Sequence, residues 1–305
     1  MKKLLSVILA CLMLLSGAAL FASCGQENSG DDLYAAYNKC IEPYKFDNAG
    51  LPELVIATSP DFAPMEFVDA SKTGDDKYVG FDIILANYLA KELNMKLVIK
   101  PMAFDACTAA LEVESVDLAI SGFSWTADRA ENFLISDWYV AGDNETEQII
   151  ITTKANEGKL TTKESFAGMK IGAQGGSLQE LLVKENFGAD NMQLYQNLDD
   201  AVEALKTGKI DALAVAVGNG DAFIAKNPDA IGASGFQFEI EDKYKNNVIL
   251  MNKKDTELCE KVNAALAKAL NAGIYDQWYE ACQILSEIKT IDELGYDADG
   301  NKITE

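Results

Sequence analysis

A single arginine stands out in a chain that otherwise uses lysine for its positive charge. All but one of the 26 basic residues are lysine, and the exception is Arg129. It follows the polar segment Ser121-Gly122-Phe123-Ser124, which comes directly after the apolar run 118–120. A guanidinium offers a planar fork of N–H donors that binds a carboxylate through two parallel hydrogen bonds, which a lysine ammonium does not provide. Residue type and position indicate an anion site, although an ordinary ion pair with one of the 48 acidic residues would use the same side chain.

Helix energetics do not explain this arginine. Thr126 is a typical N-cap residue, so Arg129 is predicted in the first turn of a helix. A cation at that end opposes the helix dipole, which favours anions there. We therefore expect the guanidinium of Arg129 to interact with a group outside its own helix.

A second strand end also has the features of an anion site. In the segment Gln174-Gly175-Gly176-Ser177-Leu178-Gln179-Glu180, Ser177 and Glu180 have the spacing of a capping box. The two glycines leave the helix start uncrowded, so its N–H groups could meet an anion. Capping alone is the simpler alternative.

A third segment, residues 59–67, follows the first predicted strand and contains Phe62 and Phe67 between or beside prolines. Loops at the carboxyl ends of parallel strands line the ligand crevice of open α/β sheets. These rings could stack on a ligand, or they could fold back onto the core.

Composition excludes several kinds of chemistry. The 305 residues contain no histidine, and 48 acidic against 26 basic side chains give a formal charge of −22. Without histidine there is no Ser-His-Asp or Cys-His nucleophile, no histidine-ligated zinc and no imidazole proton shuttle. The acidity argues against nucleic acid or anionic lipid as partners. Apolar residues make up 49% of the chain, which is typical of a folded globular protein with one large or two ordinary domains.

Cysteine spacing gives no sign of a metal cluster, because no CxxC pair occurs. The six cysteines stand at positions 11, 24, 40, 107, 259 and 282. Cys40 and Cys282 flank the main body and could form a disulfide. Buried free thiols are the simpler interpretation for Cys107 and Cys259.

The amino terminus has the pattern of an export signal. Met1-Lys2-Lys3 is followed by an apolar run over residues 4–20 and then by small residues. Phe21-Ala22-Ser23-Cys24 resembles a bacterial lipoprotein processing site, except that Phe21 stands where leucine is usual. We expect residues 1–23 to be removed and Cys24 to carry the lipid, with a polar linker after it. An uncleaved membrane anchor and plain secretion are the alternatives.

Periodicity in the main body alternates between strands and helices, which indicates an α/β fold with largely parallel sheets. The predicted strands are 54–57, 97–99, 118–120, 149–152, 171–173, 212–216 and 248–250. The predicted helices are 81–93, 106–113, 177–187, 197–206, 255–273 and 274–285. The spacing from Ala110-Leu111 to Asp117 recurs from Ala204-Leu205 to Asp211, as expected if two lobes share one plan.

The order of these segments resembles the extracellular solute-binding proteins of ABC transporters, in the polar amino-acid-binding family. The resemblance covers roughly residues 52–283. The matching segments are Val79-Gly80-Phe81-Asp82, Phe104-Asp105, Asp117 to Arg129, Phe133 to Tyr139, and the stretch from Asp211 onward.

The resemblance implies a type 2 periplasmic-binding fold, with two α/β lobes joined by two crossing strands near 143–148 and 242–247. Lobe 1 would comprise 52–144 and 246–285, and lobe 2 would comprise 145–245. Residues 24–51 would form the lipidated start and an N-terminal extension, and 286–305 a polar tail.

The resemblance also implies the ligand site. Arg129 would clamp a carboxylate of the ligand with help from Ser124 and the N–H of Ser177, while Phe62 and Phe104 would line or stack on the ligand. Ser121 and Gly122 would offer a hydroxyl and a carbonyl as hydrogen-bond acceptors for the ligand's ammonium. The predicted ligand-binding residues are Phe62, Phe104, Ser121, Gly122, Ser124, Arg129, Gly176 and Ser177. One departure from the family pattern is Ala216. The family usually has an aspartate there, which pairs with the ligand's ammonium. Asp61, Glu66 or Asp221 could substitute for it, or the ligand is not an ordinary α-amino acid.

The resulting functional hypothesis is a non-enzymatic, lipid-anchored binding protein on the outer face of the cell membrane. It would capture a small polar ligand, most simply an amino acid, and deliver it to the permease of an ABC importer. It would act as a monomer, without cofactor, metal or nucleic acid. The alternatives are a dehydratase-like enzyme on the same fold, with Glu66, Asp61 or Asp221 as general acid, and a sensor for a membrane receptor.

Overall fold

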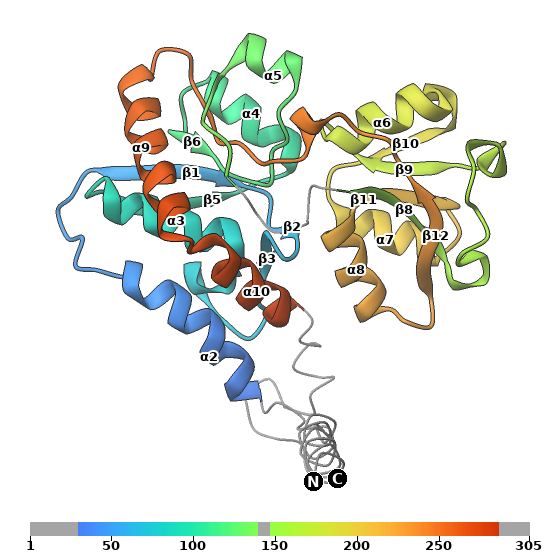
Figure 1. The fold of residues 1–305 in the computed structure, drawn as a ribbon, viewed down its shortest axis with the longest axis horizontal. Coiled ribbons are helices and arrows are strands. Elements are labelled where there is room, and N and C mark those ends of the chain that lie inside the picture. Colours follow the sequence, from blue (N-terminus) through green and yellow to red (C-terminus); the bar gives the residue numbers. More distant parts are fainter. Residues whose placement is uncertain (1–29, 140–146, 287–305) are drawn as a thin grey trace, which may run out of the picture.

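Two five-stranded sheets form two halves of the molecule, which we call lobe 1 and lobe 2 (Figure 1). The structure is a computed structural model that describes residues 30–139 and 147–286. The strand orders are β5-β1-β6-β13-β7 in lobe 1 and β10-β9-β11-β8-β12 in lobe 2. A small third sheet, β2-β3-β4, lies in lobe 1.

The elements of lobe 1 come from both ends of the chain. They are α2 (Gly30–Ile41), η1 (Glu42–Tyr44), β1 (Glu53–Thr58), β2 (Asp61–Phe62), β3 (Glu66–Val68), η2 (Gly74–Lys77), β4 (Tyr78–Val79), α3 (Phe81–Glu92), β5 (Lys96–Pro101), α4 (Phe104–Glu112), β6 (Leu118–Ala119), α5 (Ala127–Asn132), β7 (Leu134–Ile135), β13 (Leu250–Met251), α9 (Thr256–Ala272) and α10 (Tyr275–Ser286).

The elements of lobe 2 come from the middle of the chain. They are β8 (Gln148–Thr153), η3 (Lys154–Asn156), η4 (Lys163–Phe166), β9 (Ile171–Gln174), α6 (Leu178–Phe187), η5 (Ala189–Asn191), β10 (Met192–Tyr195), α7 (Leu198–Lys206), β11 (Ala212–Ala216), α8 (Val217–Lys226) and β12 (Ile231–Gln237), after which η6 (Asp242–Tyr244) leads back.

Each sheet is mixed, so the expectation of largely parallel sheets holds for only part of each. In lobe 1, β5, β1 and β6 are parallel, while β13 is antiparallel to β6 and β7. In lobe 2, β10, β9 and β11 are parallel, while β8 is antiparallel to β11 and β12. β8 and β13 each follow a passage between the lobes. No helix of their own lobe connects them to the preceding strand, so they need not be parallel to it as strands in a β-α-β unit are.

The central strands are buried on both faces because helices cover both. In β11, Ala212 and Ala214 face one core with α6, whereas Leu213 and Val215 face a second core with α7 and α8. This alternation follows from the two-residue period of a strand. Figure 1 shows α6 on one side of the lobe 2 sheet and α7 and α8 on the other.

The start of the described chain is helical and belongs to lobe 1. Helix α2 packs on α10, and its Tyr37 and Ile41 join the main core of that lobe. Part of the predicted N-terminal extension is thus a docked helix. The signal, Cys24, the first predicted crossing up to residue 146 and the tail from 287 lie outside the described residues.

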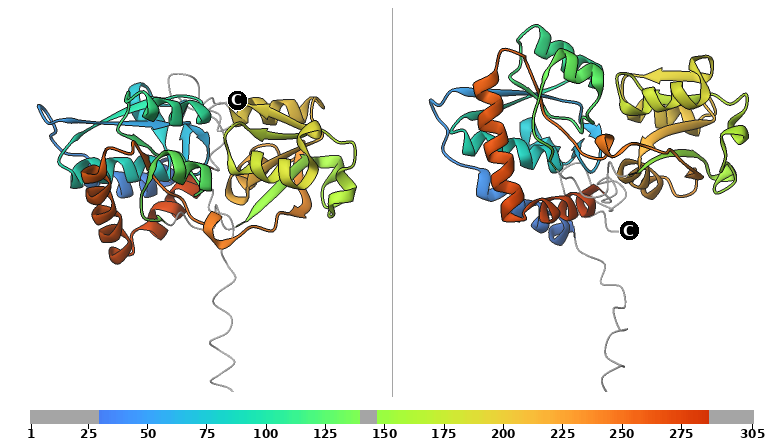
Figure 2. Two further views of the ribbon diagram at one scale, coloured as in Figure 1. Left: turned by 90° about the horizontal axis from the view of Figure 1, so that it is seen from above. Right: turned by 45° about the horizontal axis from the view of Figure 1, so that its top comes forward.

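The return passage between the lobes differs from the predicted crossing strand. It consists of the short helix η6 and the extended residue Asn247, which forms isolated bridges with Ser124 and Tyr139. The orange segment that carries η6 lies between the lobes in both views of Figure 2. The predicted strand 248–250 is observed two residues later, as β13 at Leu250–Met251. Val248 lies outside it and donates its N–H to the carbonyl of Phe123.

The described cysteines are all free thiols. The possible Cys40–Cys282 disulfide is absent from the structure, in which the Cys40 thiol donates to the carbonyl of Gln277 over 3.6 Å. Burial raises the pKa of the Cys282 thiol well above its ordinary value. Cys107 is buried as expected, whereas Cys259 is only partly buried. Across the described ranges, no helix is long and apolar enough to cross a membrane.

Candidate ligand site between the lobes

The predicted site residues converge on one small cavity between the lobes. Its volume is about 20 Å³, which is room for one or two water molecules. The lining residues are Phe62, Phe104, Ser121, Gly122, Ser124, Arg129, Gln174, Ser177, Leu178 and Gln179. All predicted residues except Gly176 are among them, and the carbonyl of Gly176 contacts Arg129.

Arg129 links the two lobes across this cavity. Its backbone N–H donates to Oγ1 of Thr126 over 3.2 Å, so the predicted cap of α5 is present. The guanidinium donates through Nη1 to the carbonyl of Ser124 over 2.5 Å and through Nη2 to the carbonyl of Gly176 over 2.8 Å. Only 5% of the residue is exposed. A buried cation needs polar partners, and carbonyl oxygens of both lobes are among those of Arg129.

Two aromatic rings pack against the guanidinium of Arg129. Its Cζ lies 4.8 Å from the ring centre of Phe123 and 5.5 Å from that of Phe104. These two rings stack at 4.5 Å. Phe104 therefore forms part of the cavity wall and also supports Arg129 by cation–π contact.

Phe62 reaches from lobe 1 toward lobe 2. It packs against hydrophobic cores of both lobes, so the ring bridges them. Gly122, at φ +54°, makes this approach possible, because a Cβ there would lie 2.7 Å from the Phe62 ring. Phe67, in contrast, is folded into the lobe 1 core.

A pair of buried acids lies behind Ser121 and Gly122. Ser121 donates its hydroxyl to Glu66 over 2.5 Å, and the N–H of Gly122 donates to Asp82 over 2.7 Å. Tyr139 also donates to Asp82, over 2.9 Å. Burial raises the pKa of Glu66 well above its ordinary value, and it raises the pKa of Asp82 to about 6. The acids hold the strand end that carries Ser121 and Gly122.

Sequence reasoning did not find this supporting role. Glu66 was considered there as a substitute acid or a general acid, and Asp82 only as part of a matching motif. A usable signal was present, since each acid stands between apolar neighbours: Met65 and Phe67, and Phe81 and Ile83. An ionisable residue within an apolar run is buried only if it has partners.

Lobe 2 contributes the start of α6. The hydroxyl of Ser177 accepts the N–H of Glu180 over 3.1 Å, which confirms the predicted N-cap. Glu180 accepts the N–H of Gly176 over 2.7 Å, and the N–H of Ser177 donates to the carbonyl of Gln174 over 3.3 Å. The N–H groups of Gly176, Ser177 and Glu180 are thus bonded within the turn in this closed arrangement.

Asp61 fastens the lobes together. Its Oδ2 accepts the N–H of Leu198, at the start of α7, over 2.7 Å and the side-chain amide of Gln174 over 3.0 Å. Burial raises the pKa of Asp61 to about 6, while the Leu198 N–H works in the opposite direction. Asn219 of α8 adds a longer bond of 3.3 Å to the carbonyl of Ala63. The structure therefore shows the lobes closed on one another.

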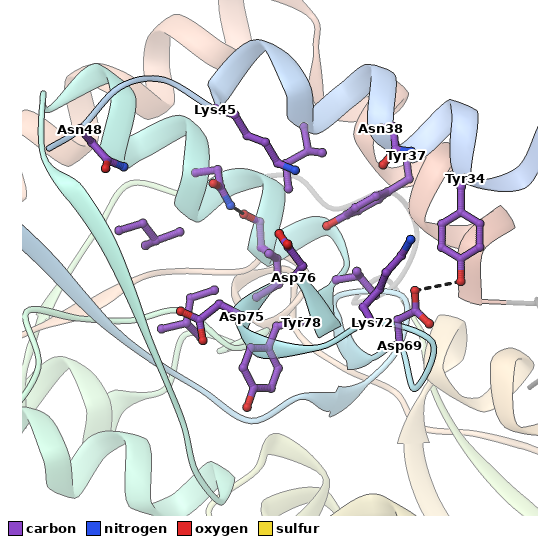
Figure 3. A pocket seen from close by; sticks show the side chains of 16 residues that line it. Tyr34, Tyr37, Asn38, Lys45, Asn48, Asp69, Lys72, Asp75, Asp76 and Tyr78 are labelled. Atoms are coloured by element: carbon purple, nitrogen blue, oxygen red, sulfur yellow. Dashed lines mark hydrogen bonds between the residues drawn. The ribbon is translucent and has the colours of Figure 1, made fainter. Parts of the chain in front are cut away.

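A larger hollow of about 300 Å³ lies elsewhere, on lobe 1 between α2 and the loop before β4 (Figure 3). Its rim includes Asp69, which accepts the hydroxyl of Tyr34 over 2.8 Å. All of its lining residues belong to lobe 1. Closure of the lobes cannot enclose a ligand there, so the smaller cavity is the better candidate site.

Among the residues that the structure describes, no group of three or more cysteine, aspartate or glutamate side chains could hold a metal ion. Ala216, at the end of β11, is fully buried, and Asp221 is exposed on α8. None of the three acids considered as substitutes for the missing aspartate lines the cavity, but Asp61 and Glu66 contact the lining residues Gln174 and Ser121.

This architecture, two α/β lobes closed over an arginine, is that of a solute-binding protein. The model of the bacterial extracellular solute-binding proteins, family 3, matches residues 54–281, and the chain belongs to this family. The match agrees with the extent of the resemblance found in the sequence, and the fold is the two-lobe type 2 periplasmic-binding fold.

Known relatives bind amino acids. The arginine-binding extracellular protein ArtP of Bacillus subtilis is 28% identical over 267 residues, 86% of this chain and 92% of that protein. A probable histidine-binding protein of Campylobacter jejuni is 30% identical over 230 residues, 73% of this chain and 82% of that protein. The substrate-binding protein AbpA of Streptococcus pneumoniae, solved with L-arginine, superposes with a TM-score of 0.71 at 30% identity, over 82% of this chain and 100% of that one.

Proposed function

We propose that the protein is an extracellular, lipid-anchored solute-binding protein that captures a small polar carboxylate between its lobes and delivers it to an ABC importer. The observation that carries this proposal is Arg129, a buried guanidinium that contacts carbonyl oxygens of both lobes inside the interlobe cavity. A ligand carboxylate would replace these carbonyls as its partner. A charge-assisted hydrogen bond of this kind contributes about 1.5–3 kcal/mol.

The other predicted residues take supporting roles in this proposal. Phe62 and Phe104 would contact the apolar part of the ligand, and Ser121, Gly122 and Ser124 would offer polar groups on the lobe 1 side. Gly176 and Ser177 would complete the site from lobe 2. The cavity must widen to admit a ligand, so binding would be coupled to lobe opening and closure. The matched relatives are solute-binding proteins, which supports binding over catalysis.

Replacing Arg129 tests the proposed site. We expect Arg129→Ala to weaken ligand binding by about a hundredfold, because at least two charge-assisted bonds are lost. Arg129→Lys should restore only part of the affinity, since an ammonium lacks the fork geometry. Titration calorimetry with the ligand found by a thermal-shift screen measures both. Lys209→Ala, at an exposed cation of lobe 2, is the control, and unchanged binding by Arg129→Ala would contradict the assignment.

The lipid anchor at Cys24 and the monomeric state are part of the same proposal. The processing pattern and the polar residues after it support an anchor that lets the binding lobes reach a permease. We expect Cys24→Ser to release the protein into the culture medium. Mass spectrometry of the cell-bound protein should find Cys24 at the mature N-terminus with attached acyl chains. An unmodified N-terminus at another residue would contradict the anchor.

A further inference from the structure

The side-chain amide of Asn247 is buried without a hydrogen-bond partner. Asn247 lies in the return passage between the lobes, after η6 and before β13, and only 1% of the residue is exposed. Within the part of the chain that the structure describes, neither its Nδ2 nor its Oδ1 makes a hydrogen bond. Water satisfies both atoms of an exposed amide, so an arrangement that buries them unpaired is less stable for it.

The backbone of Asn247, in contrast, is paired with lobe 1. Its carbonyl accepts the N–H of Tyr139 over 3.0 Å, and the residue forms a second isolated bridge with Ser124. The next residue, Val248, donates its N–H to the carbonyl of Phe123 over 2.8 Å. These bonds hold Asn247 beside the segment that contributes Ser124 to the interlobe cavity.

The amide shares its surroundings with the ring that bridges the lobes. Its Nδ2 lies 3.4 Å from the point that a Cβ on Gly122 would occupy, and the ring of Phe62 lies 2.7 Å from the same point. Phe62 packs against hydrophobic cores of both lobes. Separation of the lobes would take lobe 2 away from this ring and change the backbone angles of the passage, which gives water access to the amide.

A second amide at the lobe boundary is only partly satisfied. Asn219 of α8 is fully buried, and its Nδ2 donates to the carbonyl of Ala63 in lobe 1 over 3.3 Å. Its Oδ1 has no hydrogen-bond partner among the residues that the structure describes. Because this bond crosses between the lobes, opening would expose the whole amide of Asn219 to water.

We propose that the unpaired amide of Asn247, assisted by that of Asn219, destabilises the closed ligand-free form and thereby favours opening of the lobes. It would oppose Asp61, whose carboxylate joins the lobes through Leu198 and Gln174. The inference rests on the proposed function for its purpose. The closed form has a cavity of only about 20 Å³, so a ligand has to enter while the lobes are apart. An opposing group of this kind keeps the site accessible until a ligand fills it.

Replacing Asn247 by an apolar residue of similar size tests this proposal. We expect Asn247→Leu to raise the ratio of closed to open molecules in the ligand-free protein by about tenfold, because two unpaired polar atoms are removed. Small-angle X-ray scattering should then show a smaller radius of gyration. A radius equal to or larger than that of the wild type would overturn the proposal. No ligand is used, so this outcome would leave the proposed function standing, which Arg129→Ala tests separately.

Tyr37→Phe is the matched control. The hydroxyl of Tyr37 is also buried without a partner in the described chain, but it lies in the core of lobe 1. Its removal should raise the free energy of unfolding and leave the radius of gyration unchanged. An equal fall in radius for Tyr37→Phe and Asn247→Leu would contradict a role specific to the passage. Circular dichroism shows whether the variants fold, and Asn219→Leu decides the question by the same criterion if Asn247→Leu does not fold.

Discussion

At the scale of single residues, the unusual groups are the buried acids behind the binding segment. Glu66 and Asp82 are both inaccessible to solvent or nearly so, and their partners are the hydroxyls of Ser121 and Tyr139 and the N–H of Gly122. Burial disfavours the charged form of a carboxyl and so raises its pKa. In a chain without histidine, a buried carboxyl such as that of Asp82, whose pKa is raised to about 6, titrates in the pH range where an imidazole otherwise would.

These acids predict how stability depends on pH. A carboxyl whose pKa is higher in the folded state keeps its proton there after the unfolded chain has lost it, so stability falls as pH rises. For Asp82, with a pKa of about 6, the loss of stability begins near pH 4 and is complete above about pH 6. Glu66 extends this loss of stability to higher pH, because its pKa is also raised. We expect the free energy of unfolding to fall by roughly 1–3 kcal/mol between pH 4 and 7 through Asp82 alone, and to fall further at higher pH through Glu66. Denaturant titrations at a series of pH values measure it.

Variants separate the buried pair from the overall negative charge. Glu66→Gln should flatten the pH dependence, since one proton-binding group is removed. Glu112→Gln, at an exposed carboxyl on α4, should keep the wild-type slope. Equal slopes for all three proteins would contradict the role of the buried pair in this pH dependence.

At the scale of elements, local signals predicted helix starts well and short strands poorly. Ser177 caps α6 as expected, Asn197 caps α7 at the predicted start of that helix, and α9 ends at Gly273 with φ +63°. The sheet β2-β3-β4 was missed, because its strands of two or three residues are too short to show a period. This sheet positions Asp61 and Phe62, both of which contact lobe 2.

The contact between β2 and α7 predicts a device that favours closure. Asp61 places a carboxylate at the N-terminus of α7, where the helix dipole and the N–H of Leu198 both favour it. We expect Asp61→Ala to shift the ligand-free protein toward the open form and to weaken ligand binding by about tenfold. Small-angle X-ray scattering should show a larger radius of gyration. Asp190→Asn, at an exposed lobe 2 carboxyl, is the control, and an unchanged radius would contradict this role.

At the scale of the whole molecule, the two lobes repeat one local plan. Asp117 accepts the N–H of Val55, and Asp211 accepts the N–H of Lys170, each over 2.7 Å. In each case the aspartate precedes one strand and binds the start of its neighbour. The equal spacing seen in the sequence thus has one physical basis in both lobes. This aspartate–backbone hydrogen bond joins neighbouring parallel strands of each lobe at the end away from the cavity.

The sequence by itself determined the class of fold and most helix boundaries, and it marked Arg129 as an unusual residue. These follow from short-range physics: periodic burial, N-caps, strand ends and the rarity of arginine in this chain. The resemblance to a known family supplied the division into lobes and most of the predicted ligand-binding residues.

Only the tertiary structure decided what those residues contact. It directed the guanidinium of Arg129 to carbonyls of both lobes and placed Glu66 and Asp82 behind Ser121 and Gly122. Such contacts join positions far apart in the chain. They depend on how the lobes pack, and no local pattern carries that information.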